Sequence, residues 1–80
     1  MGKQKASDPL KEFGDNLRKL REARGLSLRN LAAQCRLDHS DISRIERGEK
    51  NITILTILEL AKGLDTHPKK LFDLDFRLED

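Results

Sequence analysis

The segment from Asp38 to Arg47 carries side chains that can hydrogen-bond to a nucleic acid, arranged along one side of a predicted short helix. At helical spacing Ile42 and Ile45 occupy one side, and the other side holds His39, Ser40, Ser43, Arg44 and Arg47. Arginine can make two hydrogen bonds to guanine in a major groove, serine can donate or accept at a base edge, and histidine can donate to guanine N7. On an isolated helix such a face is more often ordinary solvated surface, so the interpretation depends on the elements that position it.

This segment is the second of two predicted short helices joined by a tight turn. Ser27 caps the first of them, and the next polar cap, Asp38, limits that helix to about nine residues. Its inward-facing residues are Leu31, Ala32 and Cys35. In the second helix Asp41 lies at the third position, where its carboxylate faces free N–H groups, and Gly48 ends the helix. Because only a few residues around 36–37 connect them, the two helices are expected to cross steeply, as in a helix-turn-helix.

A first helix is predicted ahead of this pair. It begins at the capping pair Asp8 and Pro9, and Gly25 is placed to end it as a left-handed cap. Its apolar face consists of Leu10, Phe13, Leu17 and Leu20. Gly14 inside this helix costs on the order of 1 kcal/mol relative to alanine, which predicts a close neighbour at that point.

A fourth helix, the most apolar of the set, is predicted after the cap Thr53. Its inner face is formed by Ile54, Ile57, Leu60, Ala61 and Leu64. Leu55 and Leu58 lie off this face, so the helix is expected to be covered on a second side, either within the domain or by a partner.

A short fifth helix is predicted from Pro68, capped by Thr66 or His67. Its apolar residues, Leu71 and Phe72, are expected to return to the core. The fold class that follows is all-α, a compact five-helix bundle containing a helix-turn-helix. It would span residues 8–72, after a flexible basic arm at residues 1–7.

The tail at residues 73–80 changes period. Phe72, Leu74, Phe76 and Leu78 alternate with charged residues, which is typical of a strand. A lone strand has no partner in a helical monomer, so one hypothesis pairs this tail with the same tail of a second subunit around a two-fold axis. The alternative is a frayed tail that follows the fifth helix.

Composition indicates a single small domain with an uneven charge distribution. The chain has 80 residues and a net charge of +2. Residues 1–50 hold twelve Lys and Arg against eight Asp and Glu, a net of +4, whereas residues 51–80 hold four against six, a net of −2. The basic half is therefore the expected side for an anionic partner.

The inventory of residues argues against several other classes of protein. Cys35 is the only cysteine, so neither an intrachain disulfide nor a zinc cluster is expected, and no cofactor is implied. No stretch approaches the roughly 20 apolar residues of a membrane span, so we expect a soluble cytoplasmic protein. No enzyme is expected, because Cys35 falls on an apolar face, His67 in a capping position, and no carboxylates are spaced for catalysis.

The run from Phe13 to Phe72 resembles the helix-turn-helix domain of Cro and the lambdoid phage repressors, the xenobiotic-response-element-like group. The resemblance covers about three quarters of the chain. Its landmarks are Leu20-Arg21, Gly25-Leu26-Ser27, Leu31-Ala32, Ile42-Ser43, Ile45-Glu46, Gly48 and the helix from Ile57 to Leu64. Within the group, the stretch RLDHSDISRIERGEKNIT is most similar to controller proteins of restriction–modification systems and to single-domain bacterial repressors.

The resemblance implies roles for individual residues. His39, Ser40 and Arg44 would face bases, with Ser43 and Asp41 as further candidates, Asp41 accepting from cytosine N4 or serving only as a cap. Contacts to the DNA backbone are expected from Ser27, Arg29, Arg47, Lys50 and Asn51. Arg21 and Glu46 match a family ion pair that ties the first helix to the recognition helix.

Three positions depart from the family pattern. Leu28 stands where relatives usually carry a polar residue that touches the DNA backbone, and Ile52 replaces a frequent proline. Arg36 replaces the usual glycine of the turn, where a positive φ would be strained unless the turn is built differently.

The function expected from these features is sequence-specific binding of a near-palindromic operator by a homodimer, with two recognition helices about 34 Å apart in successive major grooves. Such a protein regulates transcription as a repressor or an activator, with RNA polymerase or a second regulatory protein as a further partner. The alternative is an antitoxin-like protein-interaction module for which DNA binding is secondary. Leu55, Leu58 and the alternating tail favour that alternative.

Overall fold

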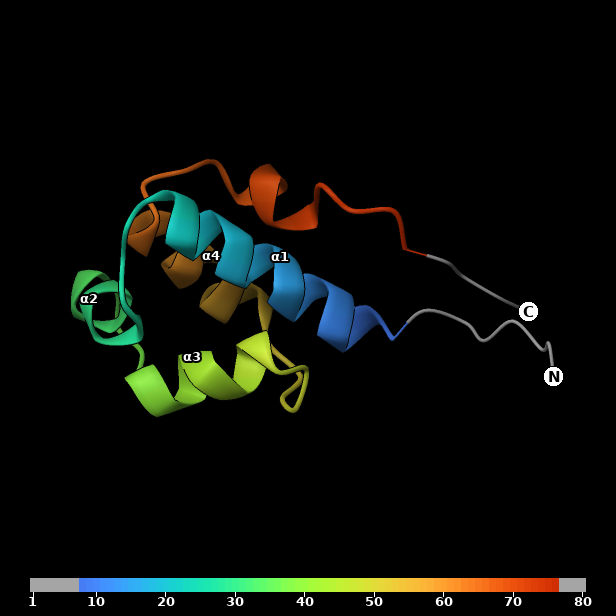
Figure 1. Ribbon diagram of the computed structural model, residues 1–80, viewed down its shortest axis with the longest axis horizontal. Coiled ribbons are helices and arrows are strands. Elements are labelled where there is room, and N and C mark those ends of the chain that lie inside the picture. Colours follow the sequence, from blue (N-terminus) through green and yellow to red (C-terminus); the bar gives the residue numbers. More distant parts are fainter. Residues whose placement is uncertain (1–7, 77–80) are drawn as a thin grey trace, which may run out of the picture.

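The computed structural model describes residues 8–76, so the predicted basic arm and Leu78 lie outside the described residues. Four α-helices and one short 3-10 helix make up this part of the chain. They are α1 (Pro9–Ala23), α2 (Leu28–Gln34), α3 (His39–Glu46), α4 (Ile54–Gly63) and the 3-10 helix η1 (Pro68–Phe72). In Figure 1, α1 crosses the domain with α3 on one side and η1 on the other, and α2 closes one end.

The helices begin where polar side chains satisfy free N–H groups. The Asp8 carboxylate accepts from the N–H groups of Leu10 and Lys11, and the hydroxyls of Ser27 and Thr53 each accept an N–H from the residue three positions on. The predicted caps of α1, α2 and α4 are therefore confirmed. Asp38 holds the capping position of α3, but its side chain makes no capping hydrogen bond.

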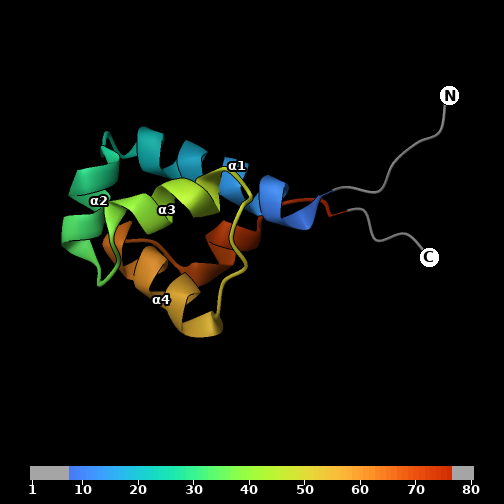
Figure 2. The ribbon, with the colours of Figure 1, turned by 90° about the horizontal axis from the view of Figure 1, so that it is seen from below.

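The core consists of apolar side chains from every element. Its buried members are Phe13, Leu17, Leu31, Ile42, Ile45, Leu60, Ala61, Leu64 and Leu71. Figure 2 shows α3 lying across the space between α1 and α4. Because the core is this small, α3 depends on both of its buried isoleucines for its position.

Helices α1 and α3 approach each other closely at Gly14. A Cβ at this position would lie 2.5 Å from the carbonyl oxygen of Glu46 and would also meet that of Ile45. The predicted close neighbour of Gly14 is therefore the backbone at the C-terminal end of α3, and only glycine leaves room for it.

The predicted count of five α-helices is wrong, because the last element is a 3-10 helix of five residues. Its cap is one of the two residues that were predicted, since His67 Nδ1 accepts from the N–H of Lys69. The amide of Asn16 on α1 donates to the carbonyl oxygens of Lys70 and Leu71, which satisfies the end of this short helix. Leu71 is buried, whereas Phe72 stays half exposed and packs its ring against Phe13 at a centroid distance of 5.3 Å.

The predicted strand is not seen in residues 73–76, the described part of the tail. Asp73 adopts φ −79° and ψ 66°, and the N–H of Leu74 donates to the carbonyl oxygen of Phe72 over 2.8 Å. These values describe an inverse γ-turn, which interrupts an extended chain. Leu74 packs against the core while Asp73 and Asp75 face solvent, so the alternation in sequence reflects an irregular segment buried on one side.

The predicted inner face of α4 is wrong at Ile54, which is 74% exposed. The helix meets its neighbours through its C-terminal half, where Gly63 lies against Leu31 and Cys35 of the α2 region. Its first turn extends beyond this contact. Leu55 and Leu58 are also exposed, so the expectation that this second side of the helix is covered within the domain is wrong for them.

We expect Gly14→Ala to destabilise the domain by about 1–3 kcal/mol, because the added methyl forces α1 away from α3 even though alanine favours a helix. Urea denaturation monitored by circular dichroism measures the free energy of unfolding. Gly25→Ala is the comparison: φ is +68° there but no atom lies within 4 Å, so backbone strain alone should cost about 1 kcal/mol. A Gly14→Ala variant as stable as the parent would contradict the close packing.

Candidate nucleic-acid interface

The helix α3 buries its apolar side and presents its polar side to solvent. Ile42 and Ile45 are almost completely buried, whereas Ser40, Arg44 and Arg47 are exposed, and His39 and Ser43 are partly exposed. We call the surface formed by His39, Ser40, Asp41, Ser43 and Arg44 the reading face. None of these five side chains is sealed in the interior of the domain, so the reading face is free to meet a ligand.

A buried ion pair fixes the orientation of α3 relative to α1. Arg21 Nε donates to Glu46 Oε2 over 2.6 Å and Nη2 donates to Oε1 over 3.0 Å, with the two side chains only 11% and 6% exposed. Arg21 Nη1 also donates to the carbonyl oxygen of Leu26 in the loop before α2. The hydrogen bond to Glu46 raises the pKa of Arg21 above its ordinary value, so the guanidinium stays charged. One side chain thus joins α1, the α1–α2 loop and α3.

The turn between α2 and α3 is built without the strain expected for Arg36. Within residues 8–76 the one non-glycine residue with a positive φ is Asp65, at 53°. The N–H of Arg36 donates to Glu59 Oε1 on α4 over 3.2 Å. An arginine is therefore accommodated here because this turn does not use the left-handed conformation that would require glycine.

Three cations lie on and beside the reading face, and each has a carboxylate neighbour. Asp41 Oδ1 lies 3.3 Å from Lys50 Nζ and 3.8 Å from Arg44 Nη1. Arg47 makes two hydrogen bonds to Glu49 and a third to the Ser43 hydroxyl. Sequence reasoning missed Glu49; its place two residues after Arg47, beyond a glycine in the left-handed conformation, was the available signal.

The residues expected to contact a DNA backbone, apart from Arg47, belong to two segments, the start of α2 and the loop after α3. Ser27 and Arg29 are exposed at the start of α2, and Lys50 and Asn51 follow α3 in the loop. Ser27 already serves as the cap of α2, and Asn51 Oδ1 accepts from the N–H of Ile52. Lys50 is partly exposed and Asn51 is exposed, so none of these four side chains is buried.

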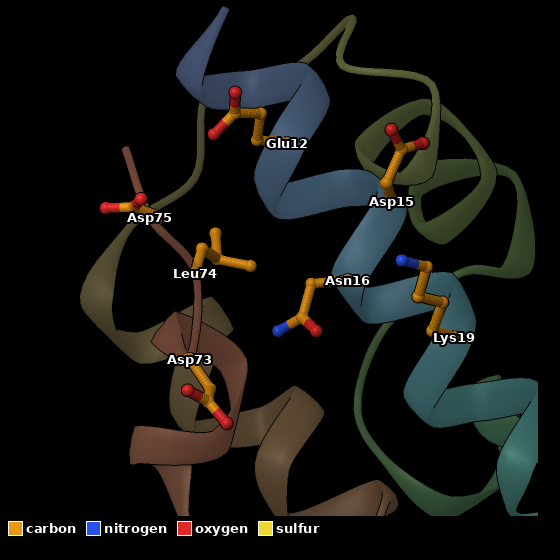
Figure 3. Close-up of a pocket in the computed structure, with 7 residues that line it drawn as sticks. All are labelled: Glu12, Asp15, Asn16, Lys19, Asp73, Leu74 and Asp75. Carbon is orange, nitrogen blue, oxygen red and sulfur yellow. The ribbon is translucent and has the colours of Figure 1, made fainter. Parts of the chain in front are cut away.

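A hollow of about 330 Å³ lies between α1 and the tail, away from α3 (Figure 3). It is lined by Glu12, Asp15, Asn16, Lys19, Asp73, Leu74 and Asp75. Four of these residues are carboxylates and one is a lysine, while Asp15 is also paired with Lys11 from outside the lining. The lining of the hollow is therefore more acidic than basic, which disfavours a polyanion there.

The thiol of Cys35 is unsuited to nucleophilic chemistry. Cys35 is partly buried, and its thiol donates to the carbonyl oxygen of Leu31. Burial raises the pKa of Cys35, which keeps the thiol protonated.

Across residues 8–76 there is no group of three His, Cys, Asp or Glu side chains that could hold a metal ion. None of the helices in these residues is long and apolar enough to cross a membrane.

Comparisons with known proteins agree with this geometry. Residues 12–73 match the family described as helix-turn-helix domain. The chain is 37% identical over 62 residues to control protein C.BamHI of Bacillus amyloliquefaciens. This match covers 76% of each of the two chains. Among solved structures, the restriction-modification controller protein C.AhdI from Aeromonas hydrophila is 44% identical with a TM-score of 0.80, covering 82% of this chain and all of that one. The controller protein C.Esp1396I, solved as a tetramer in complex with its natural 35 base-pair operator, is 31% identical with a TM-score of 0.77, covering 84% and 88%.

We expect Glu46→Ala to cost about 3 kcal/mol of unfolding free energy, since it leaves the Arg21 guanidinium buried without its counter-charge. Chemical denaturation measures this cost. The matched control is Asp15→Asn, which breaks the exposed Lys11–Asp15 pair and should change stability by less than about 0.5 kcal/mol. Equal effects from the two substitutions would show that the buried pair does not hold α3 in place.

Proposed function

The chain belongs to the helix-turn-helix domain family, and from this premise we propose that it is a sequence-specific DNA-binding transcriptional regulator. It binds a near-palindromic operator as a homodimer and works in the cytoplasm, with residues 8–72 as its DNA-binding domain. The observation that carries the proposal is the reading face of α3, exposed on one side while Ile42 and Ile45 anchor the other. The relatives are controller proteins of restriction–modification systems, and one of them was solved on its operator.

In this proposal α3 enters the major groove and its side chains read base edges. Arg44 makes a bidentate contact to guanine, while His39 and Ser40 bond neighbouring base atoms. Ser43 is a further reader. Asp41 accepts from cytosine N4 once it is released from Lys50, and otherwise neutralises that lysine in the free protein.

Phosphate contacts position the domain on the duplex. They come from Ser27 and Arg29 at the start of α2 and from Lys50 and Asn51 in the loop after α3. Arg47, which was also expected to contact a phosphate, is engaged in the free protein by Glu49 and Ser43. The acidic hollow on the far side of α1 favours the same orientation, because it keeps that side away from the phosphates.

The homodimer forms through the apolar patch on the first half of α4, consisting of Ile54, Leu55 and Leu58. Ile54 and Leu55 are each 74% exposed and Leu58 is 46% exposed. At helical spacing the three side chains lie on one face, and a two-fold axis beside α4 would place the two patches against each other. Leu74 and Phe76, the other described residues expected at a dimer contact, are partly buried in their own domain.

The same patch suits the alternative function, in which an unrelated protein is the main partner and DNA binding is secondary. The two functions differ in what the isolated protein does. A regulator dimerises on its own and binds DNA with a steep salt dependence, whereas a protein-interaction module requires its partner for either property. If the protein is a regulator, RNA polymerase or a second regulatory protein would act on the operator-bound dimer.

We expect Arg44→Ala and Lys50→Ala to weaken DNA binding in different ways. Loss of Arg44 should cost roughly 1–3 kcal/mol on the selected operator and relax the preference at one base position, because a base contact disappears. Loss of Lys50 should weaken binding to all sequences alike and lower the salt slope by about one unit. Fluorescence anisotropy with operator and random duplexes at several salt concentrations separates these effects. Equal losses on the two duplexes for Arg44→Ala would exclude its role in base reading.

We expect Leu58→Glu to shift the protein toward monomer in sedimentation without loss of helix content, since Leu58 is exposed within the domain and a charge is costly in an apolar interface. Ala33→Glu, an apolar-to-acidic change at an exposed position on α2, is the control and should leave the sedimentation coefficient unchanged. An unaltered dimer in Leu58→Glu would place the subunit contact elsewhere.

A further inference from the structure

The side chain of Arg47 is held in place by residues on both sides. Its Nε and Nη2 lie 3.1 and 3.2 Å from the two carboxylate oxygens of Glu49. Its Nη1 lies 3.0 Å from the hydroxyl oxygen of Ser43, one helical turn earlier. A guanidinium is a planar fork, so a two-bond contact with a carboxylate fixes its plane as well as its position. Glu49 therefore determines where Arg47 Nη1 points.

This contact limits what the Ser43 hydroxyl can do. A serine hydroxyl has one proton to donate and two lone pairs that accept, and Arg47 occupies one of the lone pairs. The proton cannot be given to Arg47, which has only donors, and among the described residues the Ser43 hydroxyl donates to no other group. The neighbouring positive charge also disfavours the approach of a second donor to Oγ. The hydroxyl is left as a donor directed away from Arg47.

We propose that Arg47 and Glu49 are positioning residues that commit Ser43 to donate, so that Ser43 selects an acceptor on the base edge. The acceptors available in the major groove are guanine N7 and O6, adenine N7 and thymine O4. The amino groups of cytosine and adenine offer the opposite polarity and are disfavoured at this position. The inference rests on the proposed function, because it requires the reading face to meet base edges. It gives Arg47 a role in specificity in place of a phosphate contact.

The substitution Arg47→Lys separates geometry from charge. A lysine keeps the positive charge and can still contact a phosphate, but its ammonium is a point charge and lacks the fork that bonds Glu49 and Ser43 together. Ser43→Ala first identifies the base position that Ser43 reads, by comparing fragments selected from random DNA with those that the parent protein selects. At that position we expect Arg47→Lys to reduce the preference for an acceptor by roughly fivefold, the effect of one misplaced hydrogen bond. Preferences at other positions and the salt slope should not change.

Glu49→Ala should relax the same position, because it frees Arg47. The matched control is Asp65→Asn, which removes one negative charge from an exposed loop after α4 and should leave every preference as it was. Adding Glu49→Ala or Arg47→Lys to Ser43→Ala should produce no further relaxation, since the group that they orient is already absent.

Three results would overturn the inference. The first is that Arg47→Lys retains the parent preference at the base position that Ser43 reads. The second is that Ser43→Ala changes the preference at no base position. The third is that Arg47→Ala lowers the salt slope by about 0.9, as the loss of a phosphate contact does. The proposed function survives each of these results as long as the preference that depends on Arg44 remains. Failure of the parent protein to select any operator would instead defeat the proposed function itself.

Discussion

The close packing of α3 on α1 is the constraint on which the rest of the molecule depends. A short helix can offer one whole side to DNA only when the other side is held firmly, and here two isoleucines provide the apolar contact. Gly14 allows the two backbones to approach, and the Arg21–Glu46 pair fixes their rotation. A buried pair of this kind contributes little net stability compared with apolar residues of the same size, so its value lies in orientation. In a domain with so small a core, the geometry of the recognition helix and the stability of the fold cannot be separated.

The distribution of charge adds a second level of organisation. The cations on and beside the reading face are paired with carboxylates in the free protein, whereas the lining of the hollow beside α1 contains more carboxylates than lysines. Exposed ion pairs are worth at most about 1 kcal/mol each, so a base or a phosphate can replace the contacts that Asp41 makes with Arg44 and Lys50 at little cost. The free protein thus holds these side chains in defined positions until a ligand offers equivalent acceptors.

Much of this arrangement could be predicted from the sequence, because local chemistry determines it. The caps Asp8, Ser27 and Thr53, the left-handed glycines and the polar face of α3 all follow from residue type and spacing. The failures have a common cause, since periodicity records which residues are apolar and does not say what covers them. Ile54 continues the stripe of α4 beyond the element that packs on it, and the alternating tail is a turn lying against α1. The short spacing between Arg47 and Glu49 signals a contact, but whether the two side chains meet depends on the left-handed turn of the chain at Gly48.

The role of α3 in reading DNA is tested most directly by an NMR titration of the isotopically labelled protein with its selected operator duplex. Chemical-shift changes should concentrate on His39, Ser40, Ser43 and Arg44, with smaller changes at the start of α2 and in the loop after α3. The signals of Glu12, Asp15 and Asp73 around the hollow should stay where they are. Changes centred on the hollow, with α3 unaffected, would contradict the claim that this helix is the surface that reads DNA.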